Sequence, residues 1–225
     1  MPEHEMINDL EKLDLSTLQA KLVSARNVIE AAPRDPKLES EVAAALREEI
    51  KRIQDFAEAN PDTEFAKANR HLLLGGGRPL AARSDAAIAA TASEETWKCV
   101  GSVNMSSFVW WALGGTVMFA PPLGFMFGAK GGPDWALSTF ASGIAGAFVV
   151  DPQIIRDKEM HPEGSGVGTV YKGKCKFQLG QLGAGAGGVR ISFYSLQGTY
   201  WGMLGGVSGG LGGASLSGEC DLVWS

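Results

Sequence analysis

The stretch that decides the fold is residues 171–179, with the sequence YKGKCKFQL. Lysines occupy every second position up to residue 176, and the residues between them are small or apolar. Side chains of a β-strand point alternately to opposite faces, so this period of two predicts a strand with one buried face and one solvated lysine row. Residues 216–224, LSGECDLVW, alternate in the same way. Both segments therefore predict half-buried antiparallel strands.

Further strands are predicted on both sides of a central break. The first four are expected near residues 96–106, 107–120, 123–130 and 135–150, and the last four near 167–179, 188–196, 199–208 and 213–224. Gln197-Gly198 is a predicted two-residue hairpin turn. At the break, Asp151 and Pro152 open a charged segment that predicts a short helix over 151–160. Eight antiparallel strands of this length close into a small barrel filled by side chains.

Composition divides the chain into two parts. Residues 96–225 hold 27 of the 30 glycines and 17 of the 19 aromatic residues, whereas residues 1–95 carry a net charge of −6 against −5 for the whole chain. Neither part has the basic stripe that nucleic-acid binding needs, so no nucleic-acid partner is expected. The acidic first residues do not resemble a signal peptide, so the expected location is cytoplasmic by default, with export by a signal-peptide-independent route as the alternative.

Two amphipathic helices are predicted in the first part. One follows a helical apolar spacing from Leu15 to Ile29, and the other spans residues 37–59, with a short third helix over 63–71. A five-residue connector with two prolines separates the long helices, which predicts an antiparallel hairpin. Its apolar stripes are expected to pack on the barrel, on a second copy or on a partner. A homo-oligomer through residues 10–60 is therefore one expectation.

The predicted fold class is α+β. It consists of an N-terminal helical hairpin (residues 1–71), a linker (72–95) and a compact eight-stranded antiparallel β-barrel (96–225) with one short helix between strands four and five. The linker contains the triplet Gly75-Gly76-Gly77 and has no periodicity. No Lys-Ser or Lys-Thr pair follows the triplet, which argues against a phosphate-binding loop.

No set of residues in the sequence predicts catalysis. Cys99, Cys175 and Cys220 fall on predicted inward strand faces, which favours small buried apolar side chains over nucleophiles or ligands. An odd, widely spaced set does not predict a disulfide framework. The charge around His161 is typical of a solvated surface, so no metal and no other cofactor is expected. The prediction is a protein that is not an enzyme.

An aromatic group is the candidate contact site. No charge lies between residues 98 and 130, but glycines and prolines interrupt the run, which favours buried strands over a membrane span. Adjacent strand residues point in opposite directions, so one of Trp110 and Trp111 is expected to face outward. With Phe125 and Phe127 it would form an exposed patch for a membrane or a protein, unless the N-terminal helices cover it.

The second part of the chain resembles the actinobacterial virulence-associated protein (Vap) family. The matching residues are ISFYSLQGTYWG at 191–202 and the glycine-rich run GGVSGGLGG at 205–213, with an earlier echo, LSTFASGIAGA, at 137–147. The resemblance covers at most residues 96–225. It implies a compact, non-enzymatic, host-directed or membrane-associated barrel, with no catalytic residues to carry over. The family's secretory signal and disordered N-terminal stretch have no counterpart here, where helices are predicted.

Three functional hypotheses follow. The first is a Vap-like barrel protein, a virulence-type effector that binds a host membrane lipid or a host protein. The second is a membrane-inserting, pore-forming toxin in which residues 108–127 enter the bilayer. The third is a self-assembling scaffold protein that oligomerises through its N-terminal helices. Membrane binding, leakage of vesicles and oligomeric mass would separate the three.

Overall fold

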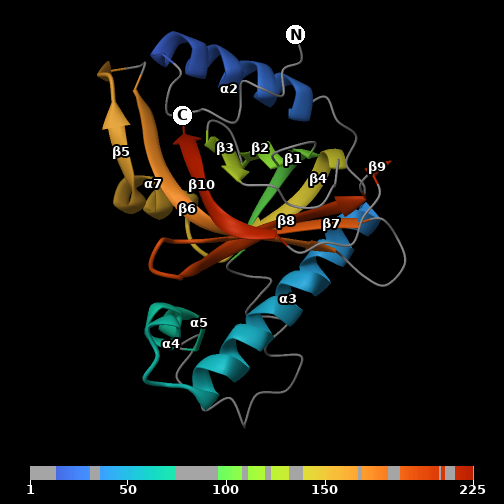
Figure 1. Cartoon of the computed structure of the whole chain (residues 1–225), viewed down its shortest axis with the longest axis vertical. Helices are drawn as coiled ribbons and strands as arrows, with labels where there is room; N and C mark the ends of the chain where they lie inside the picture. Colours follow the sequence, from blue (N-terminus) through green and yellow to red (C-terminus); the bar gives the residue numbers. More distant parts are fainter. Residues whose placement is uncertain are drawn as a thin grey trace.

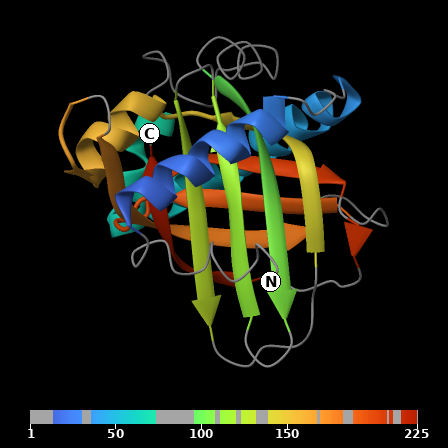
Figure 2. The ribbon, with the colours of Figure 1, turned by 90° about the horizontal axis from the view of Figure 1, so that it is seen from above.

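The structure is a computed structural model that describes residues 14–30, 36–73, 96–107, 111–119, 123–131, 139–166, 169–181, 188–207, 209–210 and 216–224. Within these ranges an antiparallel sheet closes on itself, and helices lie on its outer side (Figures 1 and 2). The strands are β1 (Trp97–Ser107), β2 (Trp111–Met118), β3 (Gly124–Gly131), β4 (Thr139–Phe148), β5 (Met160–Glu163), β6 (Val170–Gln181), β7 (Gly188–Tyr194), β8 (Tyr200–Val207), β9 (Gly209–Gly210) and β10 (Leu216–Trp224). The helices are α2 (Leu15–Glu30), α3 (Pro36–Ala59), α4 (Glu64–Ala68), α5 (Arg70–Leu73) and α7 (Pro152–Glu159).

Eight of the described strands form the barrel wall in the order β1-β2-β3-β10-β6-β7-β8-β4, and β4 pairs with β1 to complete the ring. The wall is built from two Greek keys, because β4 returns to lie beside β1 and β10 returns to lie beside β6. The two Greek keys meet at two seams, the β3–β10 pair and the β4–β8 pair. The short strands β5 and β9 extend the sheet beside β6 and β4.

The predicted barrel and its short helix are confirmed. Each predicted strand overlaps an observed one, and α7 follows β4 as expected. Asp151 caps α7, since its Oδ1 accepts a hydrogen bond from the Gln153 backbone N–H at 2.8 Å. The turn between β7 and β8 is longer than predicted. The Gly198 backbone N–H donates to the Ser195 carbonyl and so closes the turn, and Gly198 has φ +92°, a conformation that favours glycine.

The long helices do not follow the predicted hairpin. In the described part of the chain, α2 lies across β1, β2 and β3, while α3 lies against β4 and β8, on another side of the barrel (Figures 1 and 2). Each helix thus packs on the barrel rather than on the other, which was one of the options left open by the sequence. The barrel wall carries apolar residues on its outer face at both seams, and each helix buries its apolar residues against one of them.

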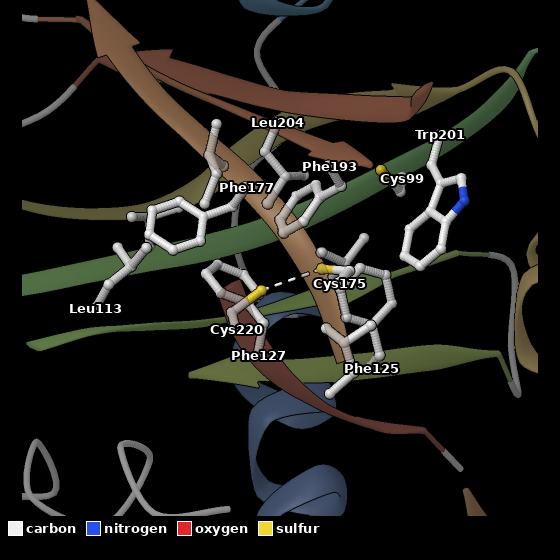
Figure 3. Close-up of a cluster of buried hydrophobic side chains, with 14 of the residues drawn as sticks. Cys99, Leu113, Phe125, Phe127, Cys175, Phe177, Phe193, Trp201, Leu204 and Cys220 are labelled. Atoms are coloured by element: carbon white, nitrogen blue, oxygen red, sulfur yellow. Dashed lines mark hydrogen bonds between the residues drawn. The ribbon is translucent and has the colours of Figure 1, made fainter. Parts of the chain in front are cut away.

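Aromatic side chains fill the centre of the barrel (Figure 3). The Phe125 ring stacks on Trp224 with ring centroids 4.7 Å apart and meets the edge of Phe193 at 5.6 Å. Glycines on the inner face make this packing possible: a Cβ at Gly115 would lie 2.5 Å from the Phe127 ring. The three cysteines are buried, as predicted.

Candidate functional site

The two phenylalanines of the predicted aromatic patch do not lie on the protein surface. Phe125 and Phe127 are both 0% exposed in the barrel core, so the expectation that they form an outer contact is wrong. β3 is buried on both faces, because its outward residue Met126 lies under α2. The backbone of Trp111 pairs with Gly131 in β2–β3, but its side chain, like all of Trp110, lies outside the described residues.

On the outer face of β6, lysines pair with acidic residues of the neighbouring strands. The lysine row predicted on β6 faces outward, and Lys172 Nζ lies 2.9 Å from Glu163 Oε2 while Lys174 Nζ lies 3.6 Å from Asp221 Oδ1. These acidic partners come from the neighbouring strands β5 and β10. Among the described residues, no group of three or more His, Cys, Asp or Glu side chains could hold a metal ion. None of the helices in the described ranges is long and apolar enough to cross a membrane.

The largest contact between the helical part and the barrel is made by α3. Its predicted apolar stripe packs on the outer face of the β4–β8 seam, and Figure 1 shows the helix running along this side of the barrel. The buried residues of this cluster are Leu38, Val42, Leu46, Ile50 and Ile53 from the helix and Ala145, Ala147, Tyr200 and Met203 from the strands. Small alanines on β4 allow the helix to approach the sheet closely. The stripe is therefore used within the chain.

Glu49 is the polar centre of this contact and is 2% exposed. Its Oε1 accepts hydrogen bonds from the Tyr194 hydroxyl at 3.0 Å and from Arg52 Nη2 at 2.7 Å. Arg190 Nη1 lies 4.0 Å from the other carboxylate oxygen. Burying a carboxylate is costly unless it is paired and hydrogen-bonded, and here it is both. The network joins α3 to β7, because Arg190 and Tyr194 belong to that strand.

Two groups of this network, Tyr194 and Arg52, keep their protons at neutral pH. Burial, with the neighbouring Glu49 carboxylate, raises the pKa of the Tyr194 hydroxyl well above its ordinary 10.0, so it remains a donor. The hydrogen bond that Arg52 donates to Glu49 raises the pKa of the Arg52 guanidinium. Burial also raises the pKa of Tyr200, whose ring meets that of Tyr194 edge-on at 5.2 Å. Groups whose pKa values lie far from neutral pH suit a structural contact better than proton transfer.

Asn69 ties the end of the helical part to the β7–β8 turn. The residue is 0% exposed and sits between α4 and α5. Its Nδ2 donates to the carbonyls of Gly198 and Phe65 at 2.8 and 2.9 Å, and its Oδ1 accepts from the Tyr200 backbone N–H at 2.7 Å. Its amide group therefore satisfies backbone groups of both the helices and the barrel.

The other seam, β3–β10, is covered by α2. Leu18, which is fully buried, packs on Met126 of β3, Val223 of β10 and Val170 of the adjacent strand β6. Asp14 caps the helix, because its Oδ1 accepts the Thr17 backbone N–H at 3.0 Å. Hydrogen bonds from Ser16 and Thr17 lower the pKa of the Asp14 carboxyl. Each seam of the barrel is thus covered on its outside by one N-terminal helix.

The sequence prediction missed the polar residues of these contacts. Glu49 lies three residues after Leu46 and four before Ile53, so it is an acidic residue inside an apolar stripe. That position was a usable signal, because charged residues are rarely fully buried without a partner. Asn69 gave no comparable signal, since a single asparagine after a helix is typical of an ordinary helix end.

No protein-family model matches the chain. No curated protein matches it either. Among solved structures it is similar to the virulence-associated protein VapB from the intracellular pathogen Rhodococcus equi, with a TM-score of 0.34, 16% sequence identity, and coverage of 58% of this chain and 97% of that chain. A likeness at this level does not bear on what the chain does.

Proposed function

We propose that the chain is a non-enzymatic, Vap-like binding protein that acts as a virulence-type effector by contacting a host membrane or a host protein. The host-directed part of the proposal comes from the sequence resemblance of residues 137–147, 191–202 and 205–213. The contact is assigned to the outside of the barrel, at the seam that α2 covers.

The observation that carries the proposal is the apolar outer face of the β3–β10 seam. The barrel interior is packed with its own aromatic side chains, so a partner has to approach from the outside. At this seam Met126, Val170 and Val223 point outward and are buried with Leu18 of a single helix. Displacement of α2 would expose a contiguous apolar surface, which is the kind of surface that contacts a membrane or another protein.

The two alternative functions are supported less well. A pore-forming toxin would carry residues 108–127 into the bilayer, yet β2 and β3 of this segment are paired on both edges within a closed ring. Insertion would require the barrel to open. A scaffold that assembles through its helices would need the α3 stripe, yet Val42, Leu46 and Ile50 already pack on the barrel.

Flotation with vesicles of mixed neutral and anionic phospholipid that contain a trapped dye tests the proposal. The proteins to compare are the full chain, a Leu18→Asp variant and a Val23→Asp variant. Leu18 is buried against the barrel, whereas Val23 is 55% exposed on the same helix. Leu18→Asp should loosen α2 and raise the fraction that floats, while Val23→Asp should behave like the unchanged chain. Circular dichroism checks that each variant still has a folded barrel.

The outcomes separate the three functions. Flotation that rises only in Leu18→Asp, without dye release, supports the proposed contact at the seam. Release of the dye favours the toxin. No flotation of any of the three proteins removes the membrane form of the proposal and directs the search to a protein partner. Equal flotation of all three would mean that the contact lies away from α2.

A further inference from the structure

Two of the three buried cysteines face each other across neighbouring strands. Cys175 of β6 and Cys220 of β10 are direct partners in the antiparallel register, and both point into the core. Their sulfur atoms are 3.1 Å apart, drawn as a dashed line in Figure 3. The third, Cys99, lies on β1 opposite Gly146, so it has no cysteine across from it on β4. The strand register singles out one pair.

We propose that Cys175 and Cys220 are a redox modification site: the pair closes into a cross-strand disulfide when the chain folds in an oxidising environment and remains a dithiol in a reducing one. The inference does not depend on the proposed effector function. It concerns the barrel itself and would hold for a chain that binds nothing.

The geometry of the pair fits a disulfide. Directly opposed residues of antiparallel strands have Cα atoms about 4.5–5.5 Å apart, which lies within the range of about 4.4–6.8 Å that a disulfide spans. The sulfur atoms must approach from 3.1 Å to a bond length of about 2.05 Å. Rotation about the side-chain bonds supplies a movement of this size, so the strand pairing can remain as it is.

The reaction balances with a low-molecular-weight disulfide such as oxidised glutathione. The thiolate of one cysteine attacks a glutathione sulfur, which breaks the glutathione disulfide, forms a mixed disulfide and releases one glutathione thiol. The second cysteine thiolate then attacks the sulfur of the first and releases the other glutathione. Two cysteine S–H bonds are lost, two glutathione S–H bonds are formed, and the protein is oxidised by two electrons.

Burial determines when this reaction takes place. Cys175 is 0% exposed and Cys220 is 2% exposed, so an oxidant cannot reach them in the closed barrel. Burial also raises the pKa of the Cys175 thiol, which suppresses the reactive thiolate. The bond should therefore form while β10 docks on β6, before the core closes. Once formed, it is shielded from reductants in the same way, so the folded barrel retains the redox state of the place in which it folded.

The experiment is refolding of the full chain from urea, once in a glutathione buffer rich in the oxidised form and once in a reducing buffer. The chain is then unfolded again in urea that contains an alkylating reagent, because all three cysteines are buried in the folded chain. The alkylated positions are mapped by mass spectrometry of the digest. We expect one alkylated cysteine, Cys99, after oxidative refolding, and three after reductive refolding. Three alkylated cysteines in both buffers, or a bridge that includes Cys99, would overturn the proposal.

Matched variants and a stability measurement complete the test. Cys99→Ala should still form the bridge, while Cys175→Ala and Cys220→Ala should not form an intrachain bridge. The oxidised wild-type chain should keep its near-ultraviolet circular dichroism and melt roughly 10 °C above the reduced chain, because the cross-link restricts the unfolded state. An oxidised chain that has lost the native spectrum would show that the bond does not belong to this barrel. The mapping of the wild-type chain stands even if a variant fails to fold.

Discussion

The Asn69 side chain accepts a hydrogen bond from the backbone N–H of Tyr200 at 2.7 Å, although the two residues are 131 positions apart in the chain. The same side chain donates to the Gly198 carbonyl at 2.8 Å. Together these bonds place the α4–α5 corner on the β7–β8 turn. They also hold the far end of α3, because α4 and α5 both pack on that helix.

Replacement of Asn69 by alanine should destabilise the protein by about 2–4 kcal/mol, because the buried Tyr200 N–H and the part-buried Gly198 carbonyl lose this partner. Urea unfolding measured by circular dichroism gives the free energy of unfolding. Asn60→Ala is the matched control, since the exposed Asn60 side chain donates to the carbonyl of Phe56, four residues earlier in the chain. If the two variants lost equal stability, Asn69 would not be the anchor described here.

Glu49→Gln should cost about 1–2 kcal/mol, because the neutral amide still reaches Tyr194 but no longer balances the arginines. Glu48→Gln changes the same charge at the exposed neighbouring position and should alter stability by no more than about 0.5 kcal/mol. The measurement is again urea unfolding. A cost that is the same for both variants would mean that only the net charge of the helix matters.

Stability should depend on pH through His71. Loss of hydration lowers its pKa below the ordinary 6.5, against an opposing effect of hydrogen bonds to the backbone of Ala68 and Tyr200. A lowered pKa means that the unfolded chain binds the proton more tightly than the folded chain does. Stability is therefore fully present above pH 6.5 and declines as the pH falls through the lower, folded-state pKa.

His71→Gln should remove this decline, which thermal unfolding across the range from pH 7.5 to about pH 5 can measure. A melting temperature that falls equally with pH in both chains would assign the pH dependence to other groups.

Phe125→Ala should destabilise the barrel by about 3–5 kcal/mol, because it empties the centre of the aromatic cluster. Phe56→Ala should cost less than about 1 kcal/mol, since Phe56 is 46% exposed on α3. The comparison also bears on the earlier expectation of a membrane contact at Phe125. A variant that folds normally but loses vesicle binding would restore that expectation.

The strands were predictable because alternation is a local signal with a direct physical cause. Cys175, Phe177 and Leu179 face the core, as the period of two requires, and Lys176 and Gln178 between them face water. The same rule failed for β3, where Met126 is buried as well as Phe125 and Phe127. A strand covered on both faces has no alternation, and only the position of α2 explains why.

The helices show what a local sequence pattern cannot predict. Their spacing predicted α2 and α3 nearly to the residue, since an apolar stripe is also a local pattern. An apolar stripe predicts that one face of a helix is buried, but it does not predict which part of the protein covers that face. The contact with the β4–β8 seam depends on Ala145 and Met203, which come about 100 residues later or more. The roles of Glu49 and Asn69 likewise depend on distant partners, which are β7 for Glu49 and the β7–β8 turn for Asn69.

The position of β10 in the ring has a consequence for synthesis on the ribosome. β10 pairs with β3 on one side and with β6 on the other, although it is made after both of them. Until residues 216–224 emerge, the growing chain carries two unpaired strand edges, which can capture strands of other nascent chains. The barrel therefore cannot close before β10 has been made, and the interval before β10 arrives is when the open edges of β3 and β6 are most exposed to other chains.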